Sequence, residues 1–196
     1  QIQDFILKKE RLVELLVEKK KSVITNELSK SRQIIKLKFI IQIQNGDGIP
    51  SDLIKNEGTY KVYGGNGVLG YHEDFNNSNE TLIIGRVGAL CGNVHYSNSN
   101  IWVNDNAMFV KTKYHYKYIY YILKSANLNS LSFANAQPLI TGALVKNVLV
   151  HFEKDEHQQY IVVDNIEIKN RKIDNAISKA KSEIENFFLT FLLSRT

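Results

Sequence analysis

The segment TLIIGRVGALCGNVHY, residues 81–96, contains two runs of β-branched and aromatic side chains with glycines in and between them. Such runs favour β-strands and glycine favours turns, so we predict strands at Thr81–Arg86 and Gly92–Tyr96. Cys91 lies beside the second strand, where we expect a small buried side chain rather than a nucleophile. This part of the chain predicts a β-rich core.

The same pattern of short β-rich runs and turn residues extends outward to about residues 34 and 152. All 11 glycines and both prolines lie between Gly46 and Gly142, so the residues that break helices are confined to this region. One internal helix is predicted at Tyr114–Ser125, and Trp102 is expected in the core. The remaining predicted strands are Ile34–Ile43, Thr59–Tyr63, Ile101–Val103, Ala107–Lys111 and Leu144–Phe152.

Long amphipathic helices are predicted on both sides of this region. In residues 1 to about 30, apolar side chains recur at spacings of three, four or seven, with lysine and glutamate between them. Near the C-terminal end, Asp155 and Gln158 have the spacing of a helix capping box. The second helix is therefore expected to begin near residue 155.

The second helix carries two series of residues that are spaced by seven. Seven of these eight positions are apolar, and this regularity predicts a coiled-coil seam. The exception, Asn170, either sets the register of the seam or is simply solvated. The series are Ile166, Ile173, Ala180 and Phe187, and Asn170, Ile177, Ile184 and Phe191. The predicted interface with a partner helix consists of Ile166, Ile173, Ile177, Ile184, Phe187 and Phe191.

Together these patterns predict an α+β fold, in which a β-rich globular domain is flanked by two long helices that form an antiparallel coiled coil. The expected boundaries are 1–33 for the N-terminal helix, 34–152 for the domain and 153–196 for the C-terminal helix. Because the sequence begins with glutamine inside a predicted helix, we expect a piece of a longer protein.

The amino-acid composition excludes several classes of protein. The chain has 196 residues, 43% of them hydrophobic, and a net charge of +5, which suits an anionic partner without showing one. A single cysteine excludes intramolecular disulfides and cysteine-rich zinc sites, and it fits a reducing cytoplasm. No apolar stretch approaches the length of a membrane span. The five histidines are scattered, so neither a metal nor a cofactor is expected.

One motif matches a nucleotide-binding signature but lacks its context. Residues 65–70 read GNGVLG, the GxGxxG pattern of dinucleotide-binding proteins, and they follow a predicted strand. The next residues, YHEDFNNSN, are polar and do not form the helix whose N-terminus would hold a pyrophosphate. We predict instead a tight hairpin, in which glycines adopt positive φ and let another backbone pass close by.

Four blocks, taken in order, resemble the target recognition domain of a type I restriction-modification specificity (S) subunit. They combine a glycine-rich hairpin, an Ile-Gly-Arg-Val-Gly turn, a Trp-X-X-X-Asn strand entry and a Gln-Pro-X-Ile turn. The flanking helices resemble the family's two conserved spacer regions. Where the family usually has a proline-containing turn before its last helix, this chain has HFEKD at residues 151–155. The blocks are YKVYGGNGVLGYHEDF (60–75), TLIIGRVGALCGNVHY (81–96), IWVNDNAMFV (101–110) and NAQPLITGALVKNVLV (135–150).

The resemblance implies a non-catalytic subunit that reads double-stranded DNA and needs no cofactor. In the family, two recognition domains separated by antiparallel helices each read half of a bipartite site, and methyltransferase (modification) and restriction/translocase subunits join them. This chain has one such domain. The resemblance therefore implies either half of a full subunit or a half-size subunit that forms a homodimer through its helices.

Candidate DNA contacts follow from side-chain chemistry within these blocks. The planar fork of Arg86 suits phosphates or guanine edges, although it also suits a structural hydrogen-bond clamp. Amides in turns can pair with adenine edges or simply form the turn. Tyrosines and lysines on the hairpin and after residue 110 can face bases or phosphates, or they can form a solvated sheet face. The candidates are Tyr60, Lys61, Tyr63, Asn66, Arg86, Asn104, Asn106, Lys111, Lys113 and Gln137.

Two functions from different classes remain at this point. The first is a DNA sequence reader, and the alternative is a helical protein-interaction scaffold without DNA recognition. An enzyme has the least support, because no acid–base pair, metal cluster or activated nucleophile stands out. Salt separates the first two, since only a DNA reader should lose duplex affinity steeply as ionic strength rises.

Overall fold

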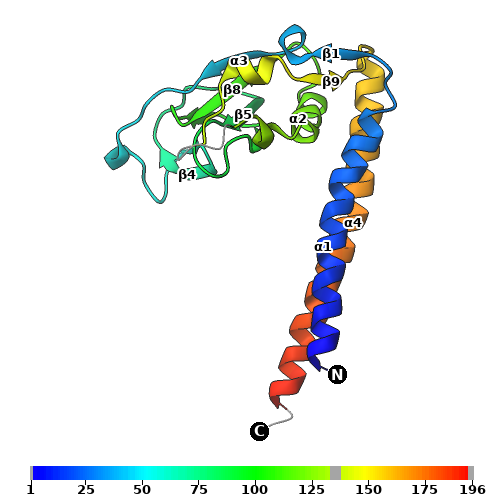
Figure 1. The fold of residues 1–196 in the computed structure, drawn as a ribbon. Helices are drawn as coiled ribbons and strands as arrows, with labels where there is room; N and C mark the ends of the chain where they lie inside the picture. The colour runs from blue at the N-terminus through cyan, green and yellow to red at the C-terminus, as the bar shows by residue number, and fades with distance from the viewer. Residues whose placement is uncertain (1, 133–137, 194–196) are drawn as a thin grey trace. The chain divides into compact units, whose positions relative to one another are not determined.

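A computed structural model describes residues 2–132 and 138–193 of the chain (Figure 1). Residues 1–30 and 161–196 form one compact unit, which we call the helical unit, and residues 31–160 form another, which we call the β unit. The long helices predicted at both ends are confirmed as α1 (Ile2–Leu28) and α4 (Glu156–Leu193). The fold is α+β, as predicted.

The described part of the β unit contains three sheets. One has four antiparallel strands in the order β2-β8-β5-β6, and a second has the order β4-β3-β7, in which β3 and β7 are parallel. The third is the antiparallel pair β1-β9. The strands are β1 (Ile34–Lys36), β2 (Gln42–Asn45), β3 (Tyr60–Gly64), β4 (Gly67–His72), β5 (Thr81–Gly85), β6 (Val94–Ser97), β7 (Ile101–Val103), β8 (Ala107–Lys111) and β9 (Leu149–His151). Short 3-10 helices are η1 (Leu37–Phe39), η2 (Ser51–Leu53) and η3 (Leu128–Leu131).

The core of the β unit takes side chains from both larger sheets. All five residues of β5 are buried, which explains why this strand reads as a continuous apolar run rather than an alternating one. On the four-stranded sheet, the helix α2 (Tyr116–Ser125) packs against β5 and β6 (Figure 1). One core cluster consists of Tyr63, Ile101 and Val103 from the three-stranded sheet and Ile83, Ala107 and Phe109 from the four-stranded sheet.

The two larger sheets meet where the β3–β4 hairpin crosses the end of β5. A Cβ atom on Gly85 would lie 2.0 Å from the carbonyl oxygen of Gly65, so only glycine permits this approach. Gly67, in the hairpin turn, has a φ of +101°. The predicted tight hairpin with close backbone passage is confirmed, and the chain continues from it into β4 rather than into a nucleotide-binding helix.

The single strand predicted at Ile34–Ile43 is wrong, because this run is divided by η1 between β1 and β2. β1 pairs with β9 and β2 pairs with β8, so the chain passes here from one sheet to another. The carbonyl oxygen of Leu37 accepts the amides of Ile40 and Ile41, at 2.9 and 3.0 Å, and this turn makes the change of sheet. Nothing in the apolar run marks the turn, since it contains neither glycine nor proline.

The strand predicted at Leu144–Phe152 is also wrong in its first half. The helix α3 (Gly142–Lys146) begins after Thr141, whose hydroxyl accepts the amide of Leu144 at 3.4 Å. Only β9 remains extended. The β-branched residues suggested a strand, but the cap at Thr141 favours a short helix. The other predicted strands and the internal helix are confirmed to within two residues at each end.

The entry into α4 is fixed by side chains instead of by a proline turn. The amide of Gln158 donates to the Asp155 carboxylate at 2.9 Å, which confirms the predicted start of the helix. Upstream, the amide of Glu153 donates to the hydroxyl of Tyr118 at 2.7 Å. Gln159 is fully buried and donates to the carbonyl of Glu153 at 2.7 Å. These hydrogen bonds fix residues 153–159 within the β unit, at the point where the family usually has a proline-containing turn.

The predicted burial is confirmed for Cys91 but not for Trp102. Cys91 is buried with 2% of its surface exposed, as predicted. Trp102 is only half-buried, because its indole nitrogen lies at the edge of the core and donates to the carbonyl of Asp47 at 3.1 Å. None of the described helices combines the length and apolar character needed to cross a membrane.

Replacing Gly85 should weaken the joint between the two sheets. We expect Gly85→Ala to lower the free energy of unfolding by about 2–3 kcal/mol, because the new methyl group overlaps the Gly65 carbonyl. Urea unfolding followed by the fluorescence of Trp102 measures this. Gly48→Ala is the matched control, since its Cβ would find its nearest atom 3.9 Å away. Equal stability of the two variants would contradict the assigned role of Gly85.

Candidate functional site

Three loops converge where the two larger sheets meet, and we call them the loop cluster: residues 64–67, 85–88 and 104–106. The amide of Asn104 donates to the carbonyl of Tyr63 at 2.9 Å, which ties the third loop to the hairpin. The amide of Arg86 donates to the carbonyl of Asn106 at 3.1 Å, which ties the second loop to the third. Segments distant in sequence are thereby held in one place by backbone hydrogen bonds.

The asparagines of the loop cluster divide into two kinds. Asn104 is buried, and its side-chain oxygen accepts the amide of Asn106 at 2.9 Å, so it forms the turn. Asn66 and Asn106 are exposed. An exposed amide on a fixed loop offers one donor and one acceptor group, the pair that an adenine edge requires. The structure thus brings two of the predicted amides to the surface and uses the third internally.

Arg86 is half-buried in the loop cluster rather than extended into solvent. Its Nη1 donates to the carbonyl of Asp105 at 3.3 Å, while its Nε is buried without a hydrogen-bond partner. This geometry matches the structural clamp that the sequence left open as the alternative to DNA contact. The clamp fixes the 104–106 loop and so acts on the position of Asn106.

The candidate residues on the β3–β4 hairpin differ in their exposure to solvent. Tyr63 is 9% exposed and belongs to the core cluster, so the expectation of a surface ring at this position is wrong. It points inward because alternate residues of β3 face the four-stranded sheet. Tyr60 is half-buried and packs edge-on against Phe75, with ring centroids 4.9 Å apart. Lys61 is exposed.

His95 lies beneath the hairpin. Its ring centroid is 6.0 Å from that of Tyr63, and a Cβ on Gly67 would lie 3.3 Å from the imidazole. Burial, with a smaller contribution from the positive charge of Lys124, lowers the pKa of His95. The imidazole is therefore neutral near pH 7. No group of three His, Cys, Asp or Glu side chains suited to a metal ion occurs within residues 2–132 and 138–193.

The remaining candidates lie away from the hairpin. Lys111 is at the opposite end of β8 from Asn106, and Lys113 follows it, so roughly 13 Å of strand separates them from the loop cluster. Gln137 falls outside the described residues. Pro138, which follows it, accepts the amide of Gly88 at 3.1 Å. Beside this bond is a pocket of about 430 Å³ lined by Val87, Gly88, Asn106, Pro138 and Leu139. Leu139, at the unspecified position of the Gln-Pro-X-Ile turn, is 42% exposed and was not among the candidates.

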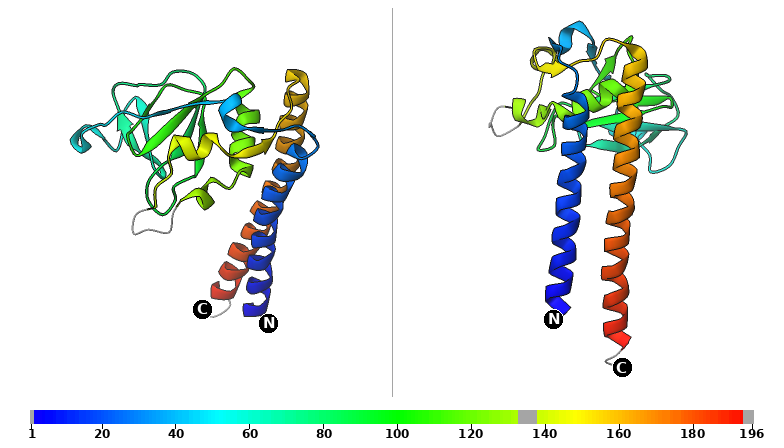
Figure 2. Two further views of the ribbon diagram at one scale, coloured as in Figure 1. Left: turned by 45° about the horizontal axis from the view of Figure 1, so that its top comes forward. Right: turned by 90° about the vertical axis from the view of Figure 1, so that its right-hand side faces the viewer.

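In the helical unit, α1 and α4 run antiparallel (Figure 2). Contacts along the pair show the register, because the partner on α4 moves backward as the residue on α1 moves forward. The pairs are Phe5 with Phe187 (ring centroids 4.8 Å apart), Lys9 with Glu183 (2.5 Å), Lys20 with Asp174 (2.7 Å) and Glu27 with Lys169 (2.6 Å). Aromatic contact and ion pairs thus both connect the helices.

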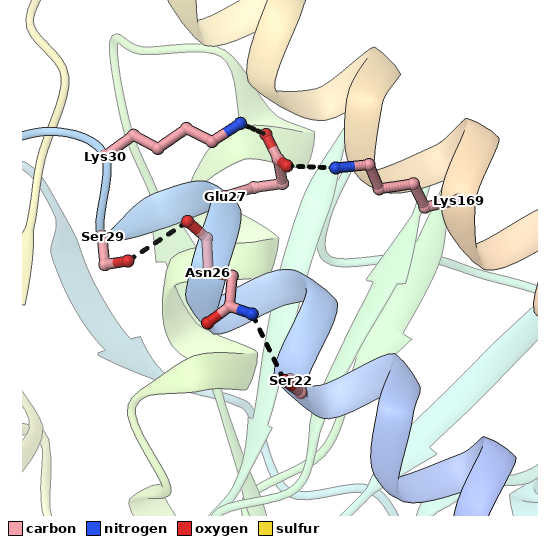
Figure 3. Close-up of polar contacts among 6 residues, drawn as sticks. All are labelled: Ser22, Asn26, Glu27, Ser29, Lys30 and Lys169. Carbon is pink, nitrogen blue, oxygen red and sulfur yellow. Dashed lines mark hydrogen bonds and ion pairs between the residues drawn. The ribbon is translucent and has the colours of Figure 1, made fainter.

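Glu27 is the most buried charged side chain of this pairing, with 3% of its side chain exposed (Figure 3). Its two carboxylate oxygens accept Lys169 and Lys30, each at 2.6 Å, while the lysine side chains remain half or more exposed. Burial alone would raise the pKa of Glu27, but the hydrogen bonds from the two lysines outweigh it and lower the pKa. Nearby, Ser29 donates to the carbonyl of Asn26 at 3.1 Å, at the end of α1.

The predicted helix interface is buried to different extents. Ile166 and Ile173 are buried, Ile177 and Ile184 are half-buried, and Phe187 is 36% exposed although it contacts Phe5. The side chain of Phe191 lies outside the described part of the structure. Asn170 is half-buried, and its side-chain oxygen is shielded from water without a hydrogen-bond partner. From the sequence, Asn170 was either a register-setting residue of the seam or a solvated residue. Its side-chain oxygen is not solvated.

Apolar side chains remain on the surface of the helical unit after α1 and α4 have paired. On α1 they include Leu12 and Leu15, which are 41% and 48% exposed. On α4, Ile161 and Ile168 are 39% and 51% exposed, and they are seven residues apart and so share a face. A pair of helices alone leaves these positions in water.

The chain thus consists of a β-rich unit inserted in the sequence between two antiparallel helices, with three loops gathered where its two larger sheets meet. Residues 30–186 match the family described as type I restriction modification DNA specificity domain. The chain belongs to this family.

A curated relative and two solved structures are similar to this chain. The type I restriction enzyme EcoprrI specificity subunit of Escherichia coli is 29% identical over 127 residues, which are 63% of this chain and 31% of that protein. The S subunit structure from M. genitalium has a TM-score of 0.69 at 16% identity, over 96% of this chain and 55% of that one. The HsdS subunit from Thermoanaerobacter tengcongensis has a TM-score of 0.58 at 14% identity, over 95% and 55%. The chain thus spans about half the length of these solved structures.

Neutralising Glu27 should loosen the helical unit in a pH-dependent manner. We expect Glu27→Gln to lower the free energy of unfolding by about 1–2 kcal/mol at pH 7, because two charge-assisted hydrogen bonds weaken. The pKa of Glu27 is lowered in the folded state, so its stabilisation is complete above the ordinary value of 4.5 and is lost as pH falls through the folded pKa. The difference between the variant and the wild type should therefore shrink in acid.

Urea unfolding followed by far-ultraviolet circular dichroism at several pH values measures this difference. The control is Glu10→Gln, at an exposed position of the same helix. A loss that is independent of pH, or equal in the two variants, would contradict the role assigned to Glu27.

Proposed function

We propose that this chain is the sequence-reading part of a type I restriction-modification complex, and that its β unit recognises one half of a bipartite double-stranded DNA site. The observation that carries the proposal is the family match over residues 30–186, which includes the whole β unit and most of α4. The named relatives are specificity subunits. The scaffold alternative has no comparable support. A DNA target also implies a cytoplasmic location.

The loop cluster is the surface best suited to reading bases. Asn66 and Asn106 are exposed amides on loops that are fixed by backbone hydrogen bonds, so little conformational entropy is lost when they contact DNA. The clamp from Arg86 holds the loop that carries Asn106. We assign base contact to the two amides, and to Arg86 the positioning of one of them.

The chain performs no chemistry in this proposal. Methyltransferase subunits and restriction/translocase subunits act at the site that the β unit selects. The helical unit supplies their docking surface or the contact with a second recognition half, through the exposed apolar positions on α1 and α4, Leu12, Leu15, Ile161 and Ile168 among them. The second half comes from the rest of a longer chain or from a second copy in a homodimer.

Binding to duplex DNA should depend steeply on salt and should favour one sequence. We expect the protein, assembled with its methyltransferase subunits, to lose affinity for any duplex as salt rises, because lysines that neutralise phosphates release counterions. Fluorescence anisotropy at several salt concentrations measures the slope. The recognised sequence comes from mapping methylated bases in cells that carry the system. Absence of both salt dependence and sequence preference would favour a scaffold.

Removing an exposed amide of the loop cluster should change the recognised sequence more than the stability. We expect Asn106→Ala and Asn66→Ala each to cost about 1–3 kcal/mol against the wild-type half-site and to relax the preference at one base position. Methylation mapping measures the change in the consensus. Asn175→Ala, at an exposed position of α4, should leave the consensus as it is. An unchanged consensus in both loop variants would exclude the loop cluster as the base-reading surface.

A further inference from the structure

Charge is divided unevenly along the β unit. Residues 47–105, which include all of the loop cluster except Asn106, contain three basic and seven acidic residues. Residues 31–46 and 106–152 contain no aspartate or glutamate at all. The basic residues of these two segments are Arg32, Lys36, Lys38, Lys111, Lys113, Lys117, Lys124 and Lys146. The chain's modest net charge therefore conceals a strongly positive part of the β unit.

The two segments without acidic residues meet at a cleft of about 460 Å³. On one side is η1 with the start of β2, and on the other is the end of β8 with the residues that lead to α2. The hydroxyl of Thr112 donates to the carbonyl of Ile40 at 2.8 Å and holds the two sides together, while Gln42 pairs with Lys111 across the strands. The lining residues are Lys38, Phe39, Ile40, Ile41, Gln42, Lys111, Thr112, Lys113 and Tyr114.

The three lysines of the cleft are exposed, and no carboxylate of the described residues forms an ion pair with them. Each lies over an aromatic ring instead: Lys38 over Phe39 at 5.0 Å, Lys111 over Phe109 at 5.5 Å and Lys113 over Tyr114 at 5.4 Å. A ring attracts an ammonium but does not cancel its charge. In the helical unit, by contrast, Lys9, Lys20 and Lys169 are paired with carboxylates.

We propose that this cleft holds the sugar-phosphate backbone of duplex DNA, with Lys38, Lys111 and Lys113 as the phosphate-binding groups. This proposal rests on the proposed function and adds a second contact region to it. Lysine is a mobile point charge without the planar fork that reads guanine, so these residues suit phosphate contact independent of sequence. Phe39, which is 68% exposed beside Lys38, provides an apolar surface for a sugar ring.

The cleft and the loop cluster have different roles in the proposed binding of DNA. Within the loop cluster, Asp105 is an exposed acid and Arg86 donates to the carbonyl of Asp105, so this surface attracts a phosphate backbone less than the cleft does, while Asn66 and Asn106 remain exposed to read bases. The cleft lies at the other end of β8, where three unneutralised ammonium groups repel one another until an anion binds. DNA spanning both would be positioned by the cleft and distinguished by the loops.

The test uses the protein assembled with its methyltransferase subunits and two labelled duplexes, one with the mapped site and one without it. We expect Lys38→Gln combined with Lys113→Gln to weaken binding to both duplexes by a similar factor, on the order of tenfold. The slope of log affinity against log salt should fall by about two, one for each lost phosphate contact. Lys38→Arg should retain wild-type affinity. Lys181→Gln, an equal charge change at an exposed position of α4, should change neither quantity.

Each other result overturns the proposal in a recognisable way. If the wild-type complex binds neither duplex, the proposed function itself fails. If it binds and the double variant keeps the same affinity and slope, DNA does not occupy the cleft. Weaker binding to the mapped site alone would mean base reading rather than backbone contact. Loss of the methyltransferase subunits with intact DNA binding would mean that the cleft docks a protein. Thermal unfolding of each variant checks that the fold is preserved.

Discussion

The crossing of Gly85 over the carbonyl of Gly65 is the constraint on which the β unit depends. The end of β5 and the β3–β4 hairpin lie so close together that no side chain fits between them. Backbone hydrogen bonds hold the turn before β8 against both. The three loops belong to two different sheets, so their relative position is set by backbone contact at one place. A rigid joint of this kind holds exposed amides at a fixed spacing, which recognition of a fixed base sequence requires.

The distribution of charge complements this joint. The helical unit uses several of its lysines in ion pairs, and residues 47–105 of the β unit contain more acidic than basic residues. In the β unit, the three lysines of the cleft form no ion pair with a carboxylate of the described residues. A net charge of +5 therefore predicts little by itself, because the local balance in the β unit differs in sign from one part to another.

Much of the architecture could be predicted from sequence because its signals are local. The capping pair Asp155 and Gln158, the heptad spacing of α4 and the glycine-rich hairpin each need only a few neighbouring residues to be recognised. The change of sheet at Leu37–Phe39 could not be predicted, since it depends on which distant strands pair with its two halves. The exposure of Tyr63 was predicted wrongly for a similar reason, because the direction of its side chain depends on a second sheet that packs against β3. The part played by Lys38 also needed the fold, because β8 and η1 are far apart in sequence and adjacent in space.

The pairing of β1 with β9 has a consequence for how this protein can evolve. These strands are the first and last of the β unit, and they hydrogen-bond to each other, so the segment between them begins and ends at the same place. Another domain with paired terminal strands could replace it without altering the length or register of α1 and α4. Under the proposed function, recombination at these two points would change the DNA half-site that is read, while α1 and α4 stayed as they were.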